Sequence, residues 1–245
     1  MELNEAALLV AGGFVAGIIN TIAGGGSLLT VPLLVMTGYP GVIANATNRV
    51  GVLVQSGVAS WRFGAEGVPG WRAAAPIMIP LLVGSTLGAL VIADLSSAVF
   101  EKVFGIVMLI MLVPALRPPK ARDAESTPWP APLVWIVFFV IGVYGGAIQA
   151  GVGIVLVLAL SRSGHDLVLA NSVKSIAVAA FTLIAVVVFV YHGQVRWLPA
   201  AVLATSQAVG ATVGARMAVR GGERVVRVAM TLAVIALAGR MLAVY

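Results

Sequence analysis

Two long apolar segments of the chain are each interrupted by glycines, and the two interruptions resemble each other. The first is Ala23-Gly24-Gly25-Gly26-Ser27 and the second is Ala150-Gly151-Val152-Gly153. A helix that starts directly after such glycines has free backbone N–H groups and a partial positive charge at its N-terminus. Helix ends of this kind bind small anions. Each interruption is therefore a candidate anion-binding element.

Polar side chains gather beside both interruptions, at equivalent places in the two halves of the chain. Polar groups are costly in hydrocarbon, so they indicate function when they occur inside apolar segments. Two of them, Arg49 and Lys174, are cationic. Amide and hydroxyl donors beside two cations favour a small oxyanion as ligand rather than Na⁺ or a sugar. The candidate substrate-binding residues are Asn20, Thr21, Gly24, Gly25, Gly26, Ser27, Asn45, Thr47, Asn48, Arg49, Gln149, Gly151, Gly153, Asn171, Ser172 and Lys174.

The two cations have few carboxylates near them in the sequence, so we expect a bound anion to be their partner. Removing either charge should then leave the stability of the unliganded protein unchanged or higher. We expect Arg49 to be the more important of the two, because a flexible lysine reaches the membrane surface more easily. The alternative is that both side chains extend to the membrane surface and bind nothing.

Other features also have a purely structural interpretation. Gly24–Gly26 could be a close helix-packing patch, and Asn45 and Asn171 could only hold helices together. The spaced pairs Gly84/Gly88 and Gly210/Gly214 are interpreted as packing contacts between helices.

The composition places these residues in a membrane. Of 245 residues, 60% are hydrophobic and 10% are charged, with a mean hydropathy of +1.07. A soluble domain has about 25% charged residues, so a water-soluble enzyme is excluded. The net charge of +6 comes from basic loops and indicates membrane topology, not nucleic-acid binding. With no cysteine, two histidines and no clustered acids, the sequence predicts no disulfide, no metal site and no cofactor.

Apolar runs should form the helices that position the polar residues. Two runs are too long for one helix, and we expect each to be two arms of about 14 residues around its glycines, about 21 Å per arm. Such arms suit a re-entrant hairpin or a bent, discontinuous helix, because the hydrocarbon core is about 30 Å thick. The runs are 5–36, 42–61, 72–93, 98–116, 131–161, 167–191, 197–215 and 225–244.

The chain contains an internal repeat. With an offset of 126, residues 38–114 overlay 164–240 with 17 identical pairs over 77 positions, among them Trp71/Trp197 and Asn45/Asn171. The hydrophilic stretch 117–128 separates the two copies. We therefore divide the chain into a first transmembrane repeat (1–116), a cytoplasmic linker (117–130) and a second transmembrane repeat (131–245).

The charges of equivalent loops predict that the repeats are inverted. Asp94 aligns with Arg220 and Glu101 with Arg227, and opposite charge is what opposite sides of a membrane select. The predicted fold is all-α: two inverted repeats, each a broken helical hairpin plus three transmembrane helices. Trp71 and Trp197 should lie in interfacial belts. The basic residues then divide into an inner set (Arg62, Arg72, Arg117, Lys120, Arg122, Arg162, Arg216, Arg220, Arg224 and Arg227) and an outer set (Lys102, Arg196 and Arg240).

The segments around both interruptions resemble the sulfite exporter TauE/SafE family. The resemblance rests on Gly13 to Pro32 followed by Ala46-Thr47-Asn48-Arg49, and on Ile148 to Gly153 followed by Ala170 to Lys174. It covers the whole chain and implies a multi-pass permease of the bacterial inner membrane for sulfite, sulfonates, thiosulfate or related anions. The second half departs from the fullest pattern, because Val152 separates its two glycines and no matching proline follows.

These observations predict a secondary transporter that moves a small sulfur-containing anion across the inner membrane by alternating access. The expected partners are that anion and the lipid bilayer; a homodimer is left open. A passive anion channel and a non-transporting membrane scaffold are the alternatives. The sequence does not indicate the direction of transport or the coupling ion.

Overall fold

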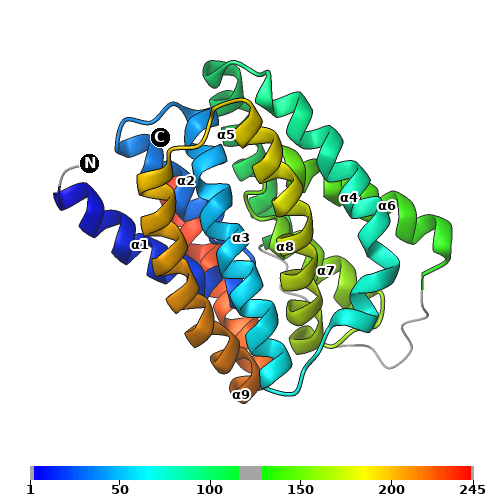
Figure 1. Cartoon of the computed structure of the whole chain (residues 1–245). Helices are drawn as coiled ribbons and strands as arrows, with labels where there is room; N and C mark the ends of the chain where they lie inside the picture. Colours follow the sequence, from blue (N-terminus) through cyan, green and yellow to red (C-terminus); the bar gives the residue numbers. More distant parts are fainter. Residues whose placement is uncertain (1–2, 116–128, 244–245) are drawn as a thin grey trace.

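A computed structural model of the chain describes residues 3–115 and 129–243, with the side chains of 108–109, 111–115, 222–227 and 229–243 outside the description. Every element in the described part is a helix, which confirms the predicted all-α class (Figure 1). The elements are α1 (Leu3–Ile22), α2 (Ser27–Met36), α3 (Gly41–Ala65), α4 (Trp71–Ala93), α5 (Ser97–Ala115), α6 (Ala131–Ala147), α7 (Val152–Arg162), α8 (Leu167–Tyr191) and α9 (Trp197–Ala243).

Both long apolar runs are broken at their glycines, as predicted, but their arms are unequal. The expected arms of about 14 residues are wrong: α1 and α2 have 20 and 10 residues, and α6 and α7 have 17 and 11. Each first arm continues up to a residue in the left-handed region, with φ of +84° at Gly24 and +62° at Gln149. That conformation ends a right-handed helix, so its position sets the arm lengths.

Helices α3 and α8 lie side by side and run in opposite directions. At one end the Ser172 hydroxyl, near the start of α8, donates to the Val68 carbonyl just after α3, at 2.7 Å. At the other end the Arg196 N–H, just after α8, donates to the Thr47 hydroxyl near the start of α3, at 3.1 Å. The contacts of each helix start with the end of the other therefore fix an antiparallel pair.

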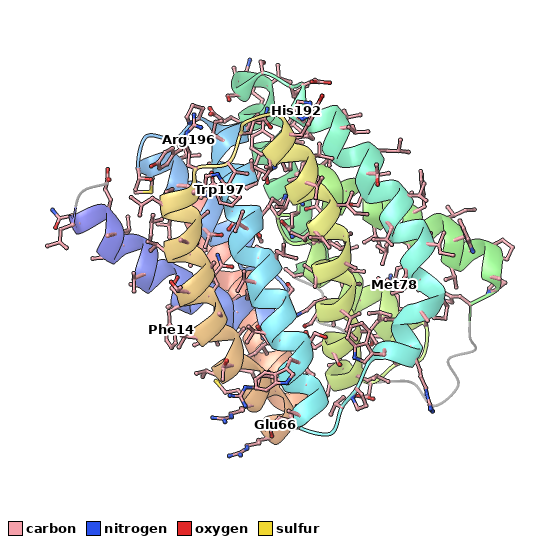
Figure 2. The ribbon with its side chains drawn as sticks, in the orientation of Figure 1. Phe14, Glu66, Met78, His192, Arg196 and Trp197 are labelled. Atoms are coloured by element: carbon pink, nitrogen blue, oxygen red, sulfur yellow. The ribbon has the colours of Figure 1, made fainter. Side chains whose placement is uncertain are left out.

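An Asp94–His192 contact and a Glu66–Arg216 ion pair mark the opposite ends of the helix bundle. The Asp94 carboxylate lies 3.6 Å from the His192 ring nitrogen, and the Glu66 carboxylate lies 3.5 Å from the Arg216 side chain. Figure 2 shows His192 and Arg196 at one end of the molecule and Glu66 at the other. The 94–96 loop and the 216–220 region thus lie at opposite ends.

Small residues allow close contact between two helix pairs, α4 with α6 and α1 with α9. A Cβ atom on Gly84 or Gly88 would overlap the backbone of α6, and one on Gly210 would overlap the backbone of α1 at Phe14. A Cβ on Gly214 would be crowded against Ile18 of α1. The interpretation of these glycines as packing contacts is confirmed.

The predicted boundary between the last two apolar runs is wrong, because α9 is one 47-residue helix across both. Residues 216–227 include four arginines and one glutamate, which favour helix, and they lack proline. The orange first part and red last part of α9 do not lie along one line in Figure 1.

Four helices in the described part are long and apolar enough to cross a membrane: Leu3–Ile22, Trp71–Ala93, Leu167–Tyr191 and Trp197–Gly221. The core between them is continuous and apolar, with Phe63, Phe138 and Phe181 fully buried. Large apolar side chains also cover the outside, for example Val91 and Val187. Trp71 and Trp197 are exposed at the starts of α4 and α9, as belt residues would be. Of the predicted basic sets, Arg117, Lys120 and Arg122 lie outside the described residues, and the side chains of Arg224, Arg227 and Arg240 lie outside the description.

Candidate functional site

The two helix breaks meet in the interior of the molecule. A Cβ atom on Gly24 would overlap the backbone of Gly153, and a Cβ on Gly153 would overlap Gly24. Only glycine allows two backbones to approach this closely, and Gly24 also needs glycine for its φ of +84°. The α1–α2 break and the α6–α7 break therefore form one site, although 127 residues separate them in the chain.

Gln149 is the one non-glycine residue with a positive φ in the described part of the chain, at +62°. A residue with a Cβ atom adopts this conformation at a cost of about 1–2 kcal/mol. Its side chain is buried and its amide nitrogen donates to the Thr182 hydroxyl of α8 at 2.7 Å, while the amide oxygen has no partner. The strained backbone thus presents one satisfied and one unsatisfied polar atom at the break.

The first break is surrounded by hydrogen bonds between amides. The Asn20 amide nitrogen donates to the Gln55 side chain of α3 at 2.5 Å, and its oxygen accepts from the Gly26 N–H at 3.2 Å. Gln55 donates in turn to the Thr21 hydroxyl at 2.8 Å. These bonds fix the end of α1 and the start of α2 against the middle of α3.

A second group of polar residues holds the start of α2. The Asn48 amide nitrogen donates to the Ser27 hydroxyl at 3.1 Å, and its oxygen accepts from Thr30 at 2.6 Å. Gln207 of α9 donates to the same Asn48 oxygen at 3.5 Å. Asn48, Ser27 and Thr30 are fully or nearly fully buried, so this network lies inside the protein.

Lys174 of α8 reaches the C-terminal end of α1, a helix of the other half. Its ammonium group donates to the carbonyls of Asn20 and Thr21 and to the side-chain oxygen of Asn171, each at 2.7 Å. The side chain is 3% exposed. Because the last carbonyls of a helix carry partial negative charge, this cation stabilises the broken end of α1.

Arg49 of α3 makes the equivalent contact from the first half to the second, at the C-terminal end of α6. Its guanidinium donates to the carbonyls of Gly145, Gly146 and Ala147 at 2.5, 2.7 and 2.9 Å. The Phe189 ring lies 5.6 Å from the guanidinium carbon, and the side chain is fully buried. Asn45 donates to the same Ala147 carbonyl at 3.1 Å. Each half therefore supplies one cation to the broken helix of the other half.

These contacts correct two expectations about the cations. Neither is without a protein partner, because helix carbonyls take the place that carboxylates would have. Neither extends to the membrane surface, since both side chains are buried. The sequence could not predict these partners, because main-chain carbonyls at a helix end carry no residue-type signal.

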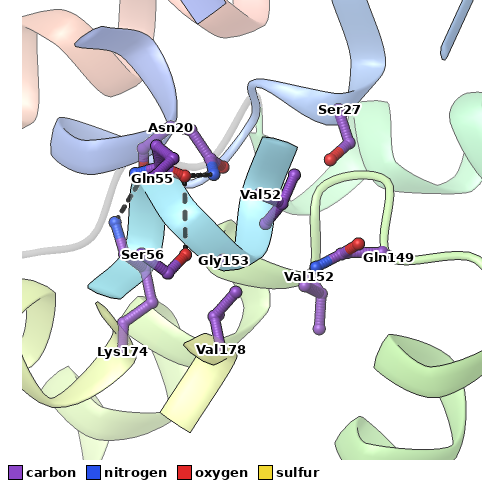
Figure 3. Close-up of a pocket in the computed structure, with 10 residues that line it drawn as sticks. All are labelled: Asn20, Ser27, Val52, Gln55, Ser56, Gln149, Val152, Gly153, Lys174 and Val178. Atoms are coloured by element: carbon purple, nitrogen blue, oxygen red, sulfur yellow. Dashed lines mark hydrogen bonds between the residues drawn. The ribbon is translucent and has the colours of Figure 1, made fainter. Parts of the chain in front are cut away.

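A small cavity lies where the breaks meet. The space open to the centre of a water molecule is about 10 Å³, enough for about one water. The first residues of α2 and α7 line it, together with the Lys174 side chain. Figure 3 shows Lys174 and the Asn20–Gln55 pair on one side, with Gln149 and Ser27 on the other. The lining residues are Asn20, Ser27, Val52, Gln55, Ser56, Gln149, Val152, Gly153, Lys174 and Val178.

The electrostatics of the cavity follow from which helix ends are neutralised. Arg49 and Lys174 cover the negative C-terminal ends of α6 and α1. The N-terminal ends of α2 and α7, where the glycines Gly26 and Gly151 are the cap residues, lie at the cavity, and at α2 the Asn20 amide oxygen accepts from the Gly26 N–H. Their partial positive charge is therefore directed at the cavity wall, which favours a negatively charged occupant.

The structure brings most of the sequence candidates to this region but not all to the cavity. Asn20, Ser27, Gln149, Gly153 and Lys174 line it. Thr21, Gly24, Gly25, Gly26, Asn48, Gly151 and Asn171 lie directly behind that lining, as neighbours in the breaks or hydrogen-bond partners. Arg49 and Asn45 lie at the end of α6, while Thr47 and Ser172 bind the loops before α9 and α4.

Gln55, Ser56 and Thr182 belong to this region but were missing from the sequence candidates. Gln55 and Ser56 lie in the middle of α3, and Thr182 lies in the middle of α8. Their signal was present in the sequence, because a glutamine inside an apolar run has the same cost in hydrocarbon as an asparagine at its start. They were missing because the candidates were chosen beside the glycines and at the starts of helices.

The fold and site define a polytopic membrane protein in which two broken helices meet at an enclosed polar cluster. The chain belongs to the sulfite exporter TauE/SafE family, whose model matches residues 9–241. It is therefore a membrane transport protein rather than an enzyme. The family resemblance seen in the motifs around both glycine breaks is confirmed.

Proteins that align with most of this chain are named as probable membrane transporters. A protein of Haemophilus influenzae named as a probable membrane transporter protein is 30% identical over 224 residues, which cover 90% of this chain and 88% of the relative. A Sinorhizobium protein named probable membrane transporter protein ORF9 is 27% identical, covering 97% of this chain and 92% of the relative. The Escherichia coli K12 protein named probable membrane transporter protein YfcA is 27% identical, covering 86% and 80%. No solved structure matches the chain.

Proposed function

We propose that the protein is a secondary transporter that moves a small sulfur-containing anion of the sulfite, sulfonate or thiosulfate class across the bacterial inner membrane. The observation that carries the proposal is the meeting of both helix breaks at a buried cavity lined by Lys174. The Lys174 ammonium and the N-termini of α2 and α7 form part of the wall, and their positive charge favours an anion. The anion class follows from the family, and the charge of the wall agrees with it.

The substrate-binding residues are proposed in two groups. Asn20, Ser27, Gln149 and Gly153 contact the anion, because they line the cavity. Lys174 also lines it and acts on the anion through its charge, since the three N–H groups of its ammonium donate to Asn20, Thr21 and Asn171. Arg49 and Asn45 act from the end of α6, where they fix the second break without reaching the cavity. This reverses our sequence-based ranking of the two cations: Lys174 is the substrate cation, and Arg49 positions a helix.

Alternating access is proposed to occur between two inverted repeats, 1–116 and 131–245, joined by a cytoplasmic linker at 117–130. The antiparallel α3 and α8 support the inversion, because these helices align in the internal repeat. The reciprocal contacts of Arg49 and Lys174 support it as well. Inward and outward openings would be exchanged by symmetric movements of the halves around the fixed breaks.

A passive anion channel is the second candidate, and the cavity favours the transporter. A space for about one water is an occluded site, in which a substrate enters only after the surrounding helices move. A channel conducts through a path that stays open. A membrane scaffold would have no use for an enclosed polar cavity, whose polar groups are costly to bury.

The proposal is tested first by ligand binding to the purified protein. Melting temperature is measured with sulfite, thiosulfate, sulfate, taurine, sulfoacetate and chloride at equal ionic strength. A ligand that binds only the folded state raises the melting temperature by an amount that grows with ln(1 + [L]/Kd), where [L] is its free concentration. We expect such a concentration-dependent rise with at least one sulfur anion and none with chloride. No rise with any sulfur anion would contradict the proposed substrate class.

A further inference from the structure

The C-terminal ends of both first arms are occupied by cations that belong to the protein itself. In transporters with discontinuous helices, the carbonyls at such ends coordinate the coupling ion, while the N-terminal ends face an anionic substrate. Here the α1 end binds the Lys174 ammonium and the α6 end binds the Arg49 guanidinium. The positions where a coupling metal ion would be expected are therefore filled by side chains.

The surroundings of the Lys174 ammonium are those of a monovalent cation site. Two main-chain carbonyls, of Asn20 and Thr21, and the amide oxygen of Asn171 lie at the same distance of 2.7 Å from its nitrogen. All three ligands are neutral oxygen atoms, and the ammonium is buried at 3% exposure. Hard cations prefer oxygen ligands of this kind. A neutral shell suits a single positive charge better than a divalent ion.

The oxygen atoms around Arg49 are arranged differently from those around Lys174, and only the Lys174 ammonium occupies a place that a small ion would fit. The guanidinium spreads over three successive carbonyls of α6, and its planar shape leaves no compact oxygen shell for a spherical ion. Arg49 does not line the cavity, whereas Lys174 does. A small ion could thus replace the lysine ammonium but not the arginine guanidinium.

We propose that Lys174 is a tethered cation that occupies the place of a coupling sodium ion, so that the protein transports its substrate without Na⁺. Removing the ammonium exposes a site for a small monovalent cation between Asn20, Thr21 and Asn171. The coupling statement rests on the proposed transport function, while the cation site does not.

The test measures the melting temperature of Lys174→Ala in NaCl, NH₄Cl and choline chloride at equal concentration. We expect Na⁺ or ammonium to raise the melting temperature of this variant by about 2 °C or more above its value in choline, and the rise to grow with the logarithm of the ion concentration. Choline is too large for the site and supplies the same ionic strength. Lys102→Ala, which removes an exposed lysine of α5, and the parent protein should show no such difference between salts.

Lys174→Met is the matched variant, because methionine fills the space of the lysine stem without its charge. Its melting temperature should be low and equal in all three salts. Equal melting temperatures of Lys174→Ala in the three salts would overturn the proposal, as would a Na⁺-specific rise in the parent. These measurements use no sulfur anion, so their failure is distinct from a failure of the proposed substrate.

Transport by the parent keeps the proposal testable if Lys174→Ala does not fold. In proteoliposomes that exchange labelled sulfite, replacing Na⁺ by choline on both sides should leave the initial rate unchanged within twofold. A rate that needs Na⁺ would overturn the tethered-cation role. Exchange that is absent in both salts would contradict the proposed function, whereas the cation site is decided by the melting temperatures of Lys174→Ala and not by transport.

Discussion

At the scale of single residues, the two buried cations share one kind of partner but differ in their distance from the cavity. Lys174 contacts three oxygens and lines the cavity, whereas Arg49 contacts three carbonyls of α6 outside it. Their positions relative to the cavity therefore separate two roles that the residue types alone do not distinguish. A buried cation that loses its partners, or carbonyls that lose their cation, become unsatisfied polar groups in a low-dielectric interior.

Replacing each cation by glutamine should separate binding from stability. Lys174→Gln should weaken sulfite binding by roughly 2–5 kcal/mol, because it removes a buried charge from the cavity wall. Arg49→Gln should lower the free energy of unfolding by about 2 kcal/mol or more through lost charged hydrogen bonds, with sulfite affinity changed by less than that. Both are measured by calorimetric binding and by melting without ligand.

Equal sulfite affinity in Lys174→Gln and the parent would remove Lys174 from the binding site. Both variants should be less stable than the parent without ligand, contrary to what an unpartnered charge would give. Arg72→Gln, at an exposed arginine, serves as the control and should change neither quantity by more than about 0.5 kcal/mol.

Two substitutions of Gln149 should differ in stability, although both should weaken binding. Both Gln149→Gly and Gln149→Ala lose the hydrogen bond to Thr182, but only the glycine variant removes the strain of a positive φ. We expect the glycine variant to be more stable than the alanine variant by about 1 kcal/mol, yet both to bind sulfite more weakly than the parent. Unfolding and binding measurements on the pair check this. Parent-like affinity in both would show that the amide only supports the backbone.

At the scale of elements, the contact between Gly24 and Gly153 joins the two broken helices. Gly153→Ala places a Cβ against the Gly24 backbone and should separate the breaks, with loss of sulfite binding and a lower melting temperature. Gly57→Ala is the control, because a Cβ atom on Gly57 would meet no other atom within 4 Å. It should behave like the parent. Normal binding by Gly153→Ala would show that close approach of the breaks is unnecessary.

The helices and their breaks could be predicted from the sequence because apolar length and glycine clusters are local signals. The span 167–191 and the start at 131 coincide with α8 and α6. The arm lengths could not be predicted, since they depend on which residue adopts a positive φ. The continuity of α9 was missed because hydropathy reports on burial in lipid, whereas helical hydrogen bonding continues through a polar segment without proline.

The candidate site was predicted in its location and only partly in its contacts. The polar clusters beside the glycines identified Asn20, Ser27, Gln149 and Lys174, which line one cavity. Contacts between the halves were beyond the sequence, because which carbonyls face Lys174 or Arg49 depends on how the helices pack. The loop contacts of Thr47 and Ser172 were hidden for the same reason.

At the scale of the whole molecule, inversion of the repeats makes a prediction about sidedness. The chain has no cysteine, so single cysteines can be introduced without background. Ser96→Cys and Arg220→Cys, both at exposed positions, should react with a membrane-impermeant thiol reagent from opposite sides. We expect labelling of Ser96→Cys in intact cells and of Arg220→Cys only in inverted vesicles. Labelling of both from the same side would contradict the inverted repeats.

The central claim, that this protein carries a small sulfur anion by alternating access, is tested most directly by counterflow in proteoliposomes. Vesicles are loaded with millimolar unlabelled sulfite and diluted into a trace of labelled sulfite, with Lys174→Gln vesicles and protein-free vesicles as controls. A transporter exchanges the two pools, so labelled sulfite should accumulate transiently above its external concentration in the parent and not in the controls. Labelled sulfite that only equilibrates across the membrane, at a rate that does not saturate and is independent of the internal pool, would contradict the claim and indicate a channel.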